Sequence, residues 1–320
     1  RGYFSGNCLV ELRAALEMNK PIILVHETDW DKGGAPLNQL MDDCRLKSAE
    51  RINGKEPFDF YRLFRESLPT PNDPTKQGRI FHVWHRIHDF QMATLKGIAA
   101  QTLLACPGLD EVHEQHPLKL SIPNSVEEQR LTFEKKVKVY TSPNNPGATD
   151  VGKELKKAFG ANFTCVDNAD DFKACATRRR LMMSKVGSSK MLRPNAADEV
   201  THMLVYLNRD TFKGEADQLE EGSEARMEAR KRAEDFAEEL HQAMTMRIPI
   251  VLLHENDTDH PVRKGCEFGH FFKTTPDELI QRLIYKPLAL ALYGGPMRTV
   301  SLAIIGKAFG AERNVGAVFS

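Results

Sequence analysis

The sequence lacks an excess of charge of either sign and any long apolar run. Its 320 residues hold 44 Lys and Arg against 44 Asp and Glu, so no net field favours nucleic acid or an anionic membrane. Its longest apolar runs, at residues 248–253 and 287–292, are far shorter than the roughly 20 residues of a membrane-spanning helix. We therefore expect no nucleic-acid partner and no membrane span.

Paired cysteines are also missing. The six cysteines form no CxxC motif, which is typical of free thiols in a reducing compartment. His82, His85 and His88 have no Cys or acidic partner at a spacing known for zinc, so we expect no metal site. The chain opens with neither Met nor a signal peptide, which favours an intracellular, cytoplasmic piece of a longer protein.

What the sequence does contain is an internal match. A gap-free alignment of residues 11–31 with residues 239–259 gives eleven identities in twenty-one positions, where ordinary composition gives about one or two. Both segments pass through an apolar Pro-Ile strand and end in His-Glu-x-Asp. Beyond an insertion, Gly33 aligns with Gly265.

A second match sets Gln91 and the residues after it against Gln281 and the residues after it. Repetition at such long spacing predicts two copies of a domain, because the units of a solenoid are far shorter. We place the copies at residues 1–133 and 134–320.

The second copy alternates predicted strands with predicted helices. The strands are expected at residues 136–141, 162–167, 201–207 and 248–254. The helices are expected at residues 150–159, 215–245 and 276–292. Residues 299–309 fit a helix or a strand equally well. This order predicts an α/β fold, a flavodoxin-like parallel sheet flanked by helices.

The first copy lacks the opening half of that pattern. It begins just before an expected helix at residues 7–16, so its first three strands would lie upstream of Arg1 or be absent. It also carries a long insertion at residues 41–78, which is rich in charge and Pro and is expected to be irregular.

The helix before each Pro-Ile strand carries a spaced pattern of residues. They are Ser5, Cys8, Glu11, Leu12 and Ala15 in the first copy and Phe236, Glu239, Leu240 and Ala243 in the second. The pattern resembles the third helix and fourth strand of Toll/interleukin receptor (TIR) domains. The resemblance covers residues 1–30 and 135–260, and it implies a TIR-like tandem repeat with its first copy incomplete.

The TIR resemblance implies self-association in signalling and, in some members, cleavage of NAD at the nicotinamide bond. The first expectation is a tandem protein-interaction or scaffold module of a larger signalling or structural protein, with other chains or itself as partner. The alternatives are an NAD glycohydrolase, with NAD as substrate and no cofactor, and a purely structural subunit of a large assembly.

If the chain is an enzyme, Glu239 and Glu11 are the catalytic candidates. The helix after the third strand and the loop after the first strand meet at the switch point of a doubly wound sheet. A carboxylate there would stabilise an oxocarbenium-like transition state, and the loop residues expected to bind the substrate are Ser142, Asn144, Asn145 and Thr149. Otherwise a Glu near a helix start is solvated and interacts with the helix dipole.

Two further features have alternative interpretations. His26-Glu-x-Asp and His254-Glu-x-Asp follow strands, so they would either bind a cation or line a cleft, or hydrogen-bond to fix the next loop. The basic stretch at residues 178–193 would bind a phosphate or an acidic partner, or form a solvated loop.

Overall fold

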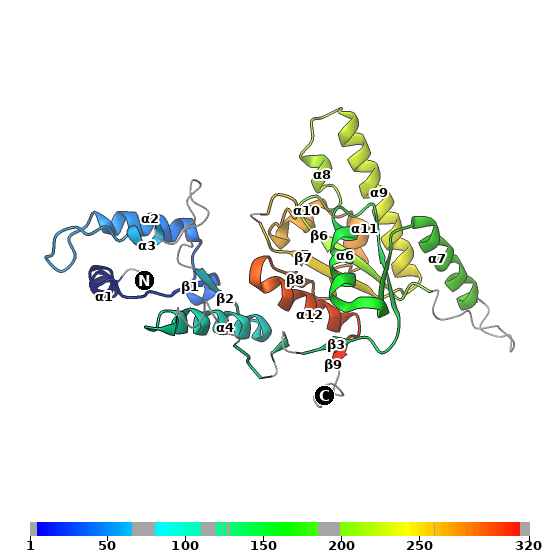
Figure 1. Ribbon diagram of the computed structural model, residues 1–320. Helices are drawn as coiled ribbons and strands as arrows, with labels where there is room; N and C mark the ends of the chain where they lie inside the picture. The colour runs from blue at the N-terminus through cyan, green and yellow to red at the C-terminus, as the bar shows by residue number, and fades with distance from the viewer. Residues whose placement is uncertain are drawn as a thin grey trace. The chain divides into compact units, whose positions relative to one another are not determined.

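The computed structural model describes residues 5–65, 81–109, 120–123, 125–126, 129–184, 199–258 and 260–313. The chain divides into two compact units, Arg1–Glu128 (unit 1) and Gln129–Ser320 (unit 2) (Figure 1). The boundary lies slightly before the expected one, because β3 (Leu131–Thr132) pairs antiparallel with β9 (Glu312–Arg313) and so belongs to unit 2.

Unit 2 is built on a five-stranded sheet whose strands are all parallel. In spatial order the strands are β5 (Phe163–Val166), β4 (Val137–Thr141), β6 (His202–Leu207), β7 (Ile250–Glu255) and β8 (Leu290–Leu292). Numbered along the chain this is the order 2-1-3-4-5 of a doubly wound sheet, compatible with a flavodoxin-like fold. The α/β prediction is confirmed, and the four expected strands are present.

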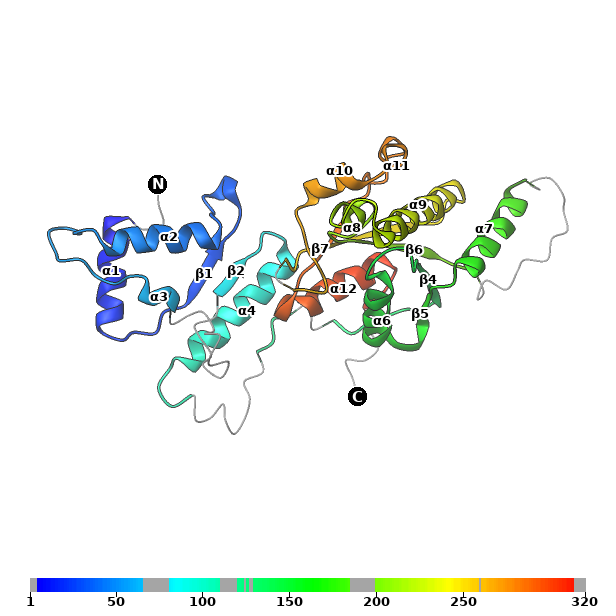
Figure 2. The same cartoon turned by 90° about the horizontal axis from the view of Figure 1, so that it is seen from above.

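Helices cover both faces of this sheet. They are α6 (Ala148–Phe159), α7 (Ala169–Ser184), α8 (Gly214–Asp217), α9 (Glu224–Thr245), α10 (Phe271–Thr274), α11 (Asp277–Gln281) and α12 (Arg298–Ala308). Successive side chains of a strand point to opposite faces, so Val205 packs with α7 and α9 while its neighbour Tyr206 packs with α6 and α12. Figure 2 shows α6 and α12 on one side of the strands and α9 on the other.

The prediction of a single helix at residues 276–292 is wrong. The helix α11 ends at Gln281, Leu283 adopts a left-handed φ of 61°, and the chain continues into strand β8. Pro287 has no N–H to extend a helix and disfavours helical geometry in the residue before it. The fifth strand was therefore missed, whereas residues 299–309, which fitted either structure, form α12.

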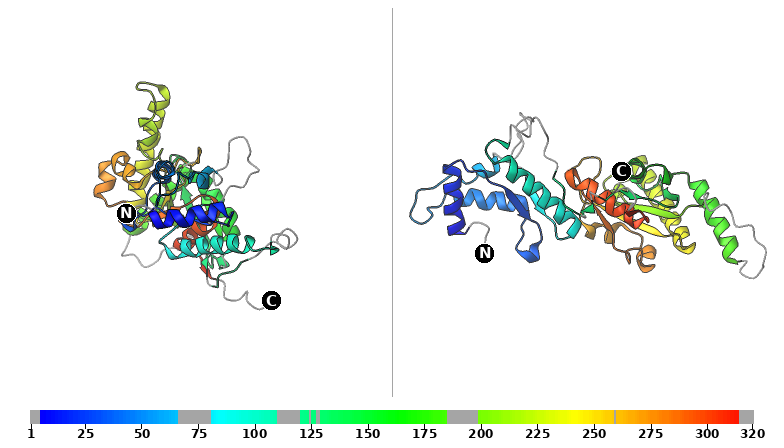
Figure 3. Two further views of the ribbon diagram at one scale, coloured as in Figure 1. Left: turned by 90° about the vertical axis from the view of Figure 1, so that its left-hand side faces the viewer. Right: turned by 60° about the horizontal axis from the view of Figure 1, so that its bottom comes forward.

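The long helix expected at residues 215–245 is divided into α8 and α9, with Ser223 capping the start of α9 through its side chain. With 22 residues, α9 is about 33 Å long, against about 20 Å for a strand of six residues. Its first half consequently projects beyond the sheet (Figure 3). No helix in the described parts of the chain is both long and apolar enough to cross a membrane.

Unit 1 contains a smaller parallel sheet. Its elements are α1 (Gly6–Glu17), β1 (Leu24–Glu27), η1 (Trp30–Lys32), α2 (Leu37–Ser48), α3 (Arg62–Arg65), β2 (Phe81–Trp84) and α4 (His88–Leu104). The strands β1 and β2 are the two that the described residues of this unit contribute. Residues 41–78 are not irregular throughout, because α2 and α3 occupy part of them, and residues 66–80 lie outside the described chain.

The second sequence match, at Gln91 and Gln281, does not pair structurally equivalent residues. Gln91 lies in the first turns of the 17-residue helix α4, whereas Gln281 ends α11 and is followed by the turn at Leu283. Instead, β2 and β8 occupy the same place, since each pairs in parallel with the strand that ends in His-Glu and each precedes a helix.

Candidate functional site

Glu239 lies on α9 beside the end of β4, and its side chain is buried, with 3% exposed. Its Oε1 accepts a hydrogen bond of 2.9 Å from Asn144 Nδ2 in the loop after β4. Strands β4 and β6 are neighbours in the sheet, and the chain continues from β4 to β5 on one side and from β6 to β7 on the other. Doubly wound sheets bind ligands at such a switch point. The structure therefore brings together two parts of the predicted site.

The environment of the Glu239 carboxyl penalises its charge. Burial raises the pKa of Glu239 above its usual range, while Ser142, Asn144, Tyr140 and Lys173 act in the opposite direction. Within the described residues, neither Glu239 Oε2 nor Tyr140 Oη has a hydrogen-bond partner of good geometry. Tyr140 and Ser142 lie close enough to the carboxyl to lower its pKa. Buried polar atoms without partners are rare, and this corner of the switch point holds two of them.

Most polar side chains of the loop expected to bind a ligand hydrogen-bond within the protein. Ser142 is buried, and its Oγ accepts the N–H of Asn144 at 3.0 Å. The amide of Asn145 exchanges two hydrogen bonds of 2.8 Å with the backbone of Tyr206, so Asn145 anchors the loop to β6. Thr149 is half-buried in the first turn of α6. Asn144 is the candidate that the structure hydrogen-bonds to Glu239.

Sequence reasoning missed a polar group after β6. Asn208 is buried and donates from Nδ2 to the carbonyl of Pro146 at 3.0 Å, which ties the loops after β4 and β6 together. Its Oδ1 accepts the N–H of Asp210, whose carboxylate forms an ion pair with Lys264 at 2.5 Å. The available signal was the polar Asn-x-Asp sequence directly after a buried strand, at the edge where such sheets bind ligands.

Glu11, which aligns with Glu239, is exposed on α1. At helical spacing the sequence predicts an apolar stripe of Cys8, Leu12, Ala15 and Leu16 beside Glu11. That expectation is wrong in part, because the buried residues of α1 are Leu9 and Leu16, and Cys8 is exposed. Leu9 packs with the core of α2 and the loop after it, while no strand among the described residues covers the Cys8 side. Glu11 therefore fits the solvated alternative.

The repeated His-Glu-x-Asp phrase has one structure in both units. His26 Nε2 donates to the carbonyl of Ala35 at 2.7 Å, and His254 Nε2 donates to the carbonyl of Cys266 at 2.8 Å. Burial lowers the pKa of His254, which favours the neutral ring with one donor. The hydrogen-bonding interpretation is confirmed, since each His fixes the loop that follows its strand.

In unit 1 the glutamate of the His-Glu-x-Asp phrase, Glu27, stabilises the turn that follows the strand. Glu27 Oε1 accepts the N–H of Asp29 at 2.8 Å, two residues further on. Its Oε2 forms an ion pair with Arg86, just before α4, and the Arg86 side chain is 49% exposed. This exposed ion pair links the end of β1 to the residues that follow β2.

The same turn in unit 2 is buried. Glu255 Oε1 accepts the N–H of Asp257 at 3.0 Å, and Oε2 is 2.8 Å from Tyr206 Oη and 2.9 Å from Arg298 Nη1. Arg298, the first residue of α12, also makes a bidentate pair with Glu154 at 2.9 and 2.7 Å. One guanidinium thereby connects β7 with α6 and α12.

A glycine follows the His-Glu-x-Asp phrase in each unit and explains the sequence match after the insertion. A Cβ on Gly34 would lie 2.6 Å from the carbonyl oxygen of Asp29, and one on Gly265 would lie 2.7 Å from the carbonyl carbon of Asp257. Only glycine tolerates so close an approach of backbone. Gly265 is therefore the structural counterpart of Gly34, and its sequence alignment with Gly33 is wrong by one residue.

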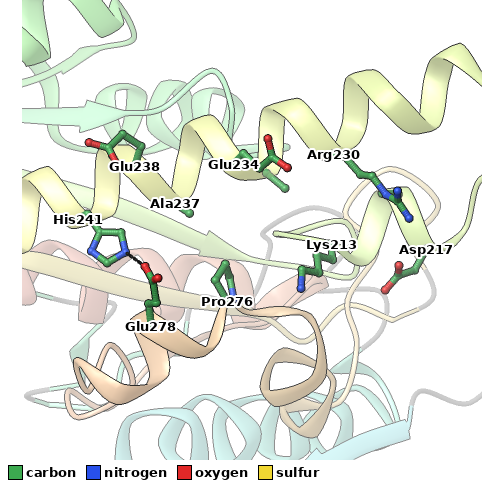
Figure 4. A pocket seen from close by; sticks show the side chains of 11 residues that line it. Lys213, Asp217, Arg230, Glu234, Ala237, Glu238, His241, Pro276 and Glu278 are labelled. Carbon is green, nitrogen blue, oxygen red and sulfur yellow. Dashed lines mark ion pairs between the residues drawn. The ribbon is translucent and has the colours of Figure 1, made fainter.

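A groove of about 640 Å³ lies between α8, α9 and α11 (Figure 4). Its wall of small residues includes Ala233 and Ala237, and charged side chains of both signs form its rim. His241 Nε2 lies 3.3 Å from the Glu278 carboxylate. Glu239 does not line this groove, so the groove is separate from the candidate site.

The remaining candidates have other contacts. His82 Nε2 is 2.7 Å from Gln101 Oε1, and the His85 ring lies 5.4 Å from Phe90. In the described ranges, no group of three or more His, Cys, Asp or Glu is placed to hold a metal ion. Most of the basic stretch, from residue 185 onward, lies outside the described chain.

Comparison of the chain with models of protein families, with curated proteins and with solved structures finds no match.

Proposed function

We propose that the chain holds two divergent TIR-like domains in tandem and acts as a protein-interaction module of a larger signalling or structural protein. The observation that supports the duplication is a shared helix-to-strand connection. A Met follows the last residue of each helix, Met18 after α1 and Met246 after α9. The next residues, Asn19 and Arg247, adopt left-handed φ values of 49° and 52°. Non-glycine residues rarely adopt such values.

An exposed apolar patch in unit 2 supports the interaction role. Phe272 and Leu288 are 55% and 88% exposed, and the Phe272 ring lies 5.5 Å from Tyr285. Tyr285 and Leu288 line a shared cavity of about 290 Å³ that reaches His254. Grouped apolar exposure of this kind marks sites of association. We therefore assign self-association of the chain to this Phe272 patch.

The test is sedimentation velocity of the 320-residue chain over a range of concentrations. The double variant Phe272→Ser/Leu288→Ser should weaken association by at least about tenfold, because two apolar anchors at an interface contribute more than about 1.4 kcal/mol together. Met227→Ser, which changes a side chain 60% exposed on α9, serves as the matched control. A wild type that stays monomeric, or an equal loss in the control, would exclude this role for the patch.

NAD glycohydrolysis is the second candidate, favoured by the buried Glu239 carboxyl next to Asn144 and Tyr140. A carboxylate at the switch point would stabilise the developing positive charge on the ribose. Because Glu239 is 3% exposed, a substrate reaches it only if the loop after β4 moves. A purely structural subunit is the third candidate and remains if neither activity is found.

Glu239→Gln tests the enzymatic candidate. It keeps the shape of the side chain and removes its charge, so nicotinamide release should fall on the order of a hundredfold. The raised pKa of Glu239 gives the pH dependence of folding. The neutral carboxyl stabilises the fold below the usual Glu pKa, and this contribution is lost as the pH rises through the folded-state pKa. The variant should therefore be relatively more stable than the wild type at pH 8 than at pH 4. No release of nicotinamide by the wild type excludes the candidate.

A further inference from the structure

The tip of the loop after β4 is a short turn that is firmly anchored at one end. The Asn145 N–H donates to the Ser142 carbonyl at 3.1 Å, and the Asn144 N–H donates to the Ser142 hydroxyl at 3.0 Å. The side-chain amide of Asn145 is bound to the backbone of Tyr206 by two hydrogen bonds of 2.8 Å. Strand β4 ends directly before the turn. Movement of the turn without disruption of the sheet is therefore confined to residues 142–144.

This turn covers the Glu239 carboxyl, and exposure falls from the tip of the turn inward. Pro143 is exposed, Asn144 is half-buried and Glu239 is buried. Within the described chain, the hydrogen bond of 2.9 Å from Asn144 Nδ2 to Glu239 Oε1 is the one that joins the turn to α9. A displacement of Asn144 therefore opens a path from solvent to the carboxyl.

The closed position of the turn leaves two buried polar atoms, Glu239 Oε2 and Tyr140 Oη, without hydrogen-bond partners among the described residues. Burial raises the pKa of both groups. Lys173 on α7 acts against this shift at Glu239, whereas Asp167, after β5, adds to it at Tyr140. A buried polar group without a partner destabilises the closed position relative to an open one that water can enter.

We propose that residues 142–144 form a gate over the Glu239 carboxyl, held closed through Asn144 while the carboxyl is protonated and opened when it loses its proton to solvent. In the closed position a carboxylate is buried and has one amide donor, whereas in the open position water solvates it. Because burial raises the pKa of Glu239 in the closed position, closure is fully favoured below the usual Glu pKa. This preference is lost as the pH rises through the closed-state pKa.

The gate would regulate access to the site of the proposed NAD glycohydrolysis, and its biological role rests on that function. Its opening does not, because the opening can be measured without substrate. A gate that opens in a chain that releases no nicotinamide refutes the enzymatic candidate alone, whereas nicotinamide release from a chain with a static turn refutes the gate alone.

Hydrogen exchange of backbone amides in the 320-residue chain tests the gate. From about pH 5 to about pH 8, the protection factors of the Asn144 and Asn145 amides should fall by at least about tenfold, the effect of a pKa shift of about one unit. The Tyr206 amide, which donates to Asn145 Oδ1, should stay protected, because the motion ends at Asn145. Glu239→Gln should abolish the pH dependence. Glu238→Gln, which changes the exposed neighbouring carboxyl on α9, is the matched control and should behave as the wild type.

Two further variants act on the closed position itself. Asn144→Ala removes the hydrogen bond to Glu239, so at about pH 5 the protection factor of the Asn145 amide should fall about fivefold. Tyr140→Phe removes one polar atom that lacks a partner, so the same protection factor should rise by a similar factor at about pH 8. The wild-type pH profile and Asn144→Ala decide the question if Glu239→Gln does not fold.

Three results would overturn the gate. They are a wild-type protection factor at Asn145 that stays constant with pH, a fall that persists in Glu239→Gln, and an equal fall at Tyr206, which would report opening of the whole loop or of unit 2. Unchanged exchange in Asn144→Ala would also overturn it, since Asn144 would then not hold the turn closed.

Discussion

Arg298→Ala is expected to lower the free energy of unfolding of unit 2 by about 3–5 kcal/mol. The guanidinium is mostly buried and bridges Glu154 to Glu255, whose side chain is fully buried. Removal of one partner leaves a buried carboxylate without its opposite charge, which costs more than the pair contributes. Both tryptophans, Trp30 and Trp84, lie in unit 1, so hydrogen exchange of the β7 amides in urea is the measurement for unit 2.

The ion pair between Arg86 and Glu27 in unit 1 offers a matched control for this variant. Arg86→Ala removes the corresponding partner of Glu27, but the Arg86 side chain is 49% exposed, so a loss of less than about 1 kcal/mol is expected in unit 1. The double variant Glu255→Gln/Arg298→Met should recover part of the loss, because it leaves no charge at either position. Equal losses for Arg298→Ala and Arg86→Ala would contradict the role assigned to burial.

Phe236→Ala should destabilise unit 2 by about 3–5 kcal/mol, the usual cost of removing a buried aromatic ring. The Phe236 side chain is fully buried and packs near Phe212 and the core of α9. Its counterpart Cys8 is exposed on α1, so Cys8→Ala should change the stability of unit 1 by less than about 0.5 kcal/mol. Urea unfolding monitored by tryptophan fluorescence follows unit 1, and hydrogen exchange of α9 follows unit 2.

A loss of more than about 2 kcal/mol in Cys8→Ala would contradict the exposed position of Cys8 on α1. A small loss in Phe236→Ala would mean instead that the core of unit 2 relaxes around the deleted ring.

Periodicity predicted most of unit 2 because burial repeats along its elements. The run from Thr201 to Leu207 has the continuous apolar character of a strand covered on both faces, and β6 is such a strand. The end of the sheet was not predictable in this way, since Leu290 to Leu292 form a short strand after the left-handed turn at Leu283. A left-handed conformation at Leu is set by tertiary contacts rather than by its own preference.

The candidate site was predictable in outline only. Chain order and the switch-point rule brought Glu239 to the loop after β4, and the structure has Glu239 hydrogen-bonded to Asn144 there. Asn145 hydrogen-bonds to the backbone of β6, and Arg298 forms an ion pair with Glu255, which is distant in sequence. Both contacts depend on strand register and on the placement of the helices. Neither leaves a periodic signal in the sequence.

The pairing of β3 with β9 brings the two ends of unit 2 into adjacent strands, with Leu131 opposite Arg313 and Thr132 opposite Glu312. Paired residues of neighbouring antiparallel strands have Cα atoms about 4.5–5.5 Å apart. A domain that is entered and left at nearly one point can be inserted into another chain, repeated or circularly permuted without stretching its connections. The geometry of that short ribbon thus makes unit 2 a module that can be moved between chains as one piece.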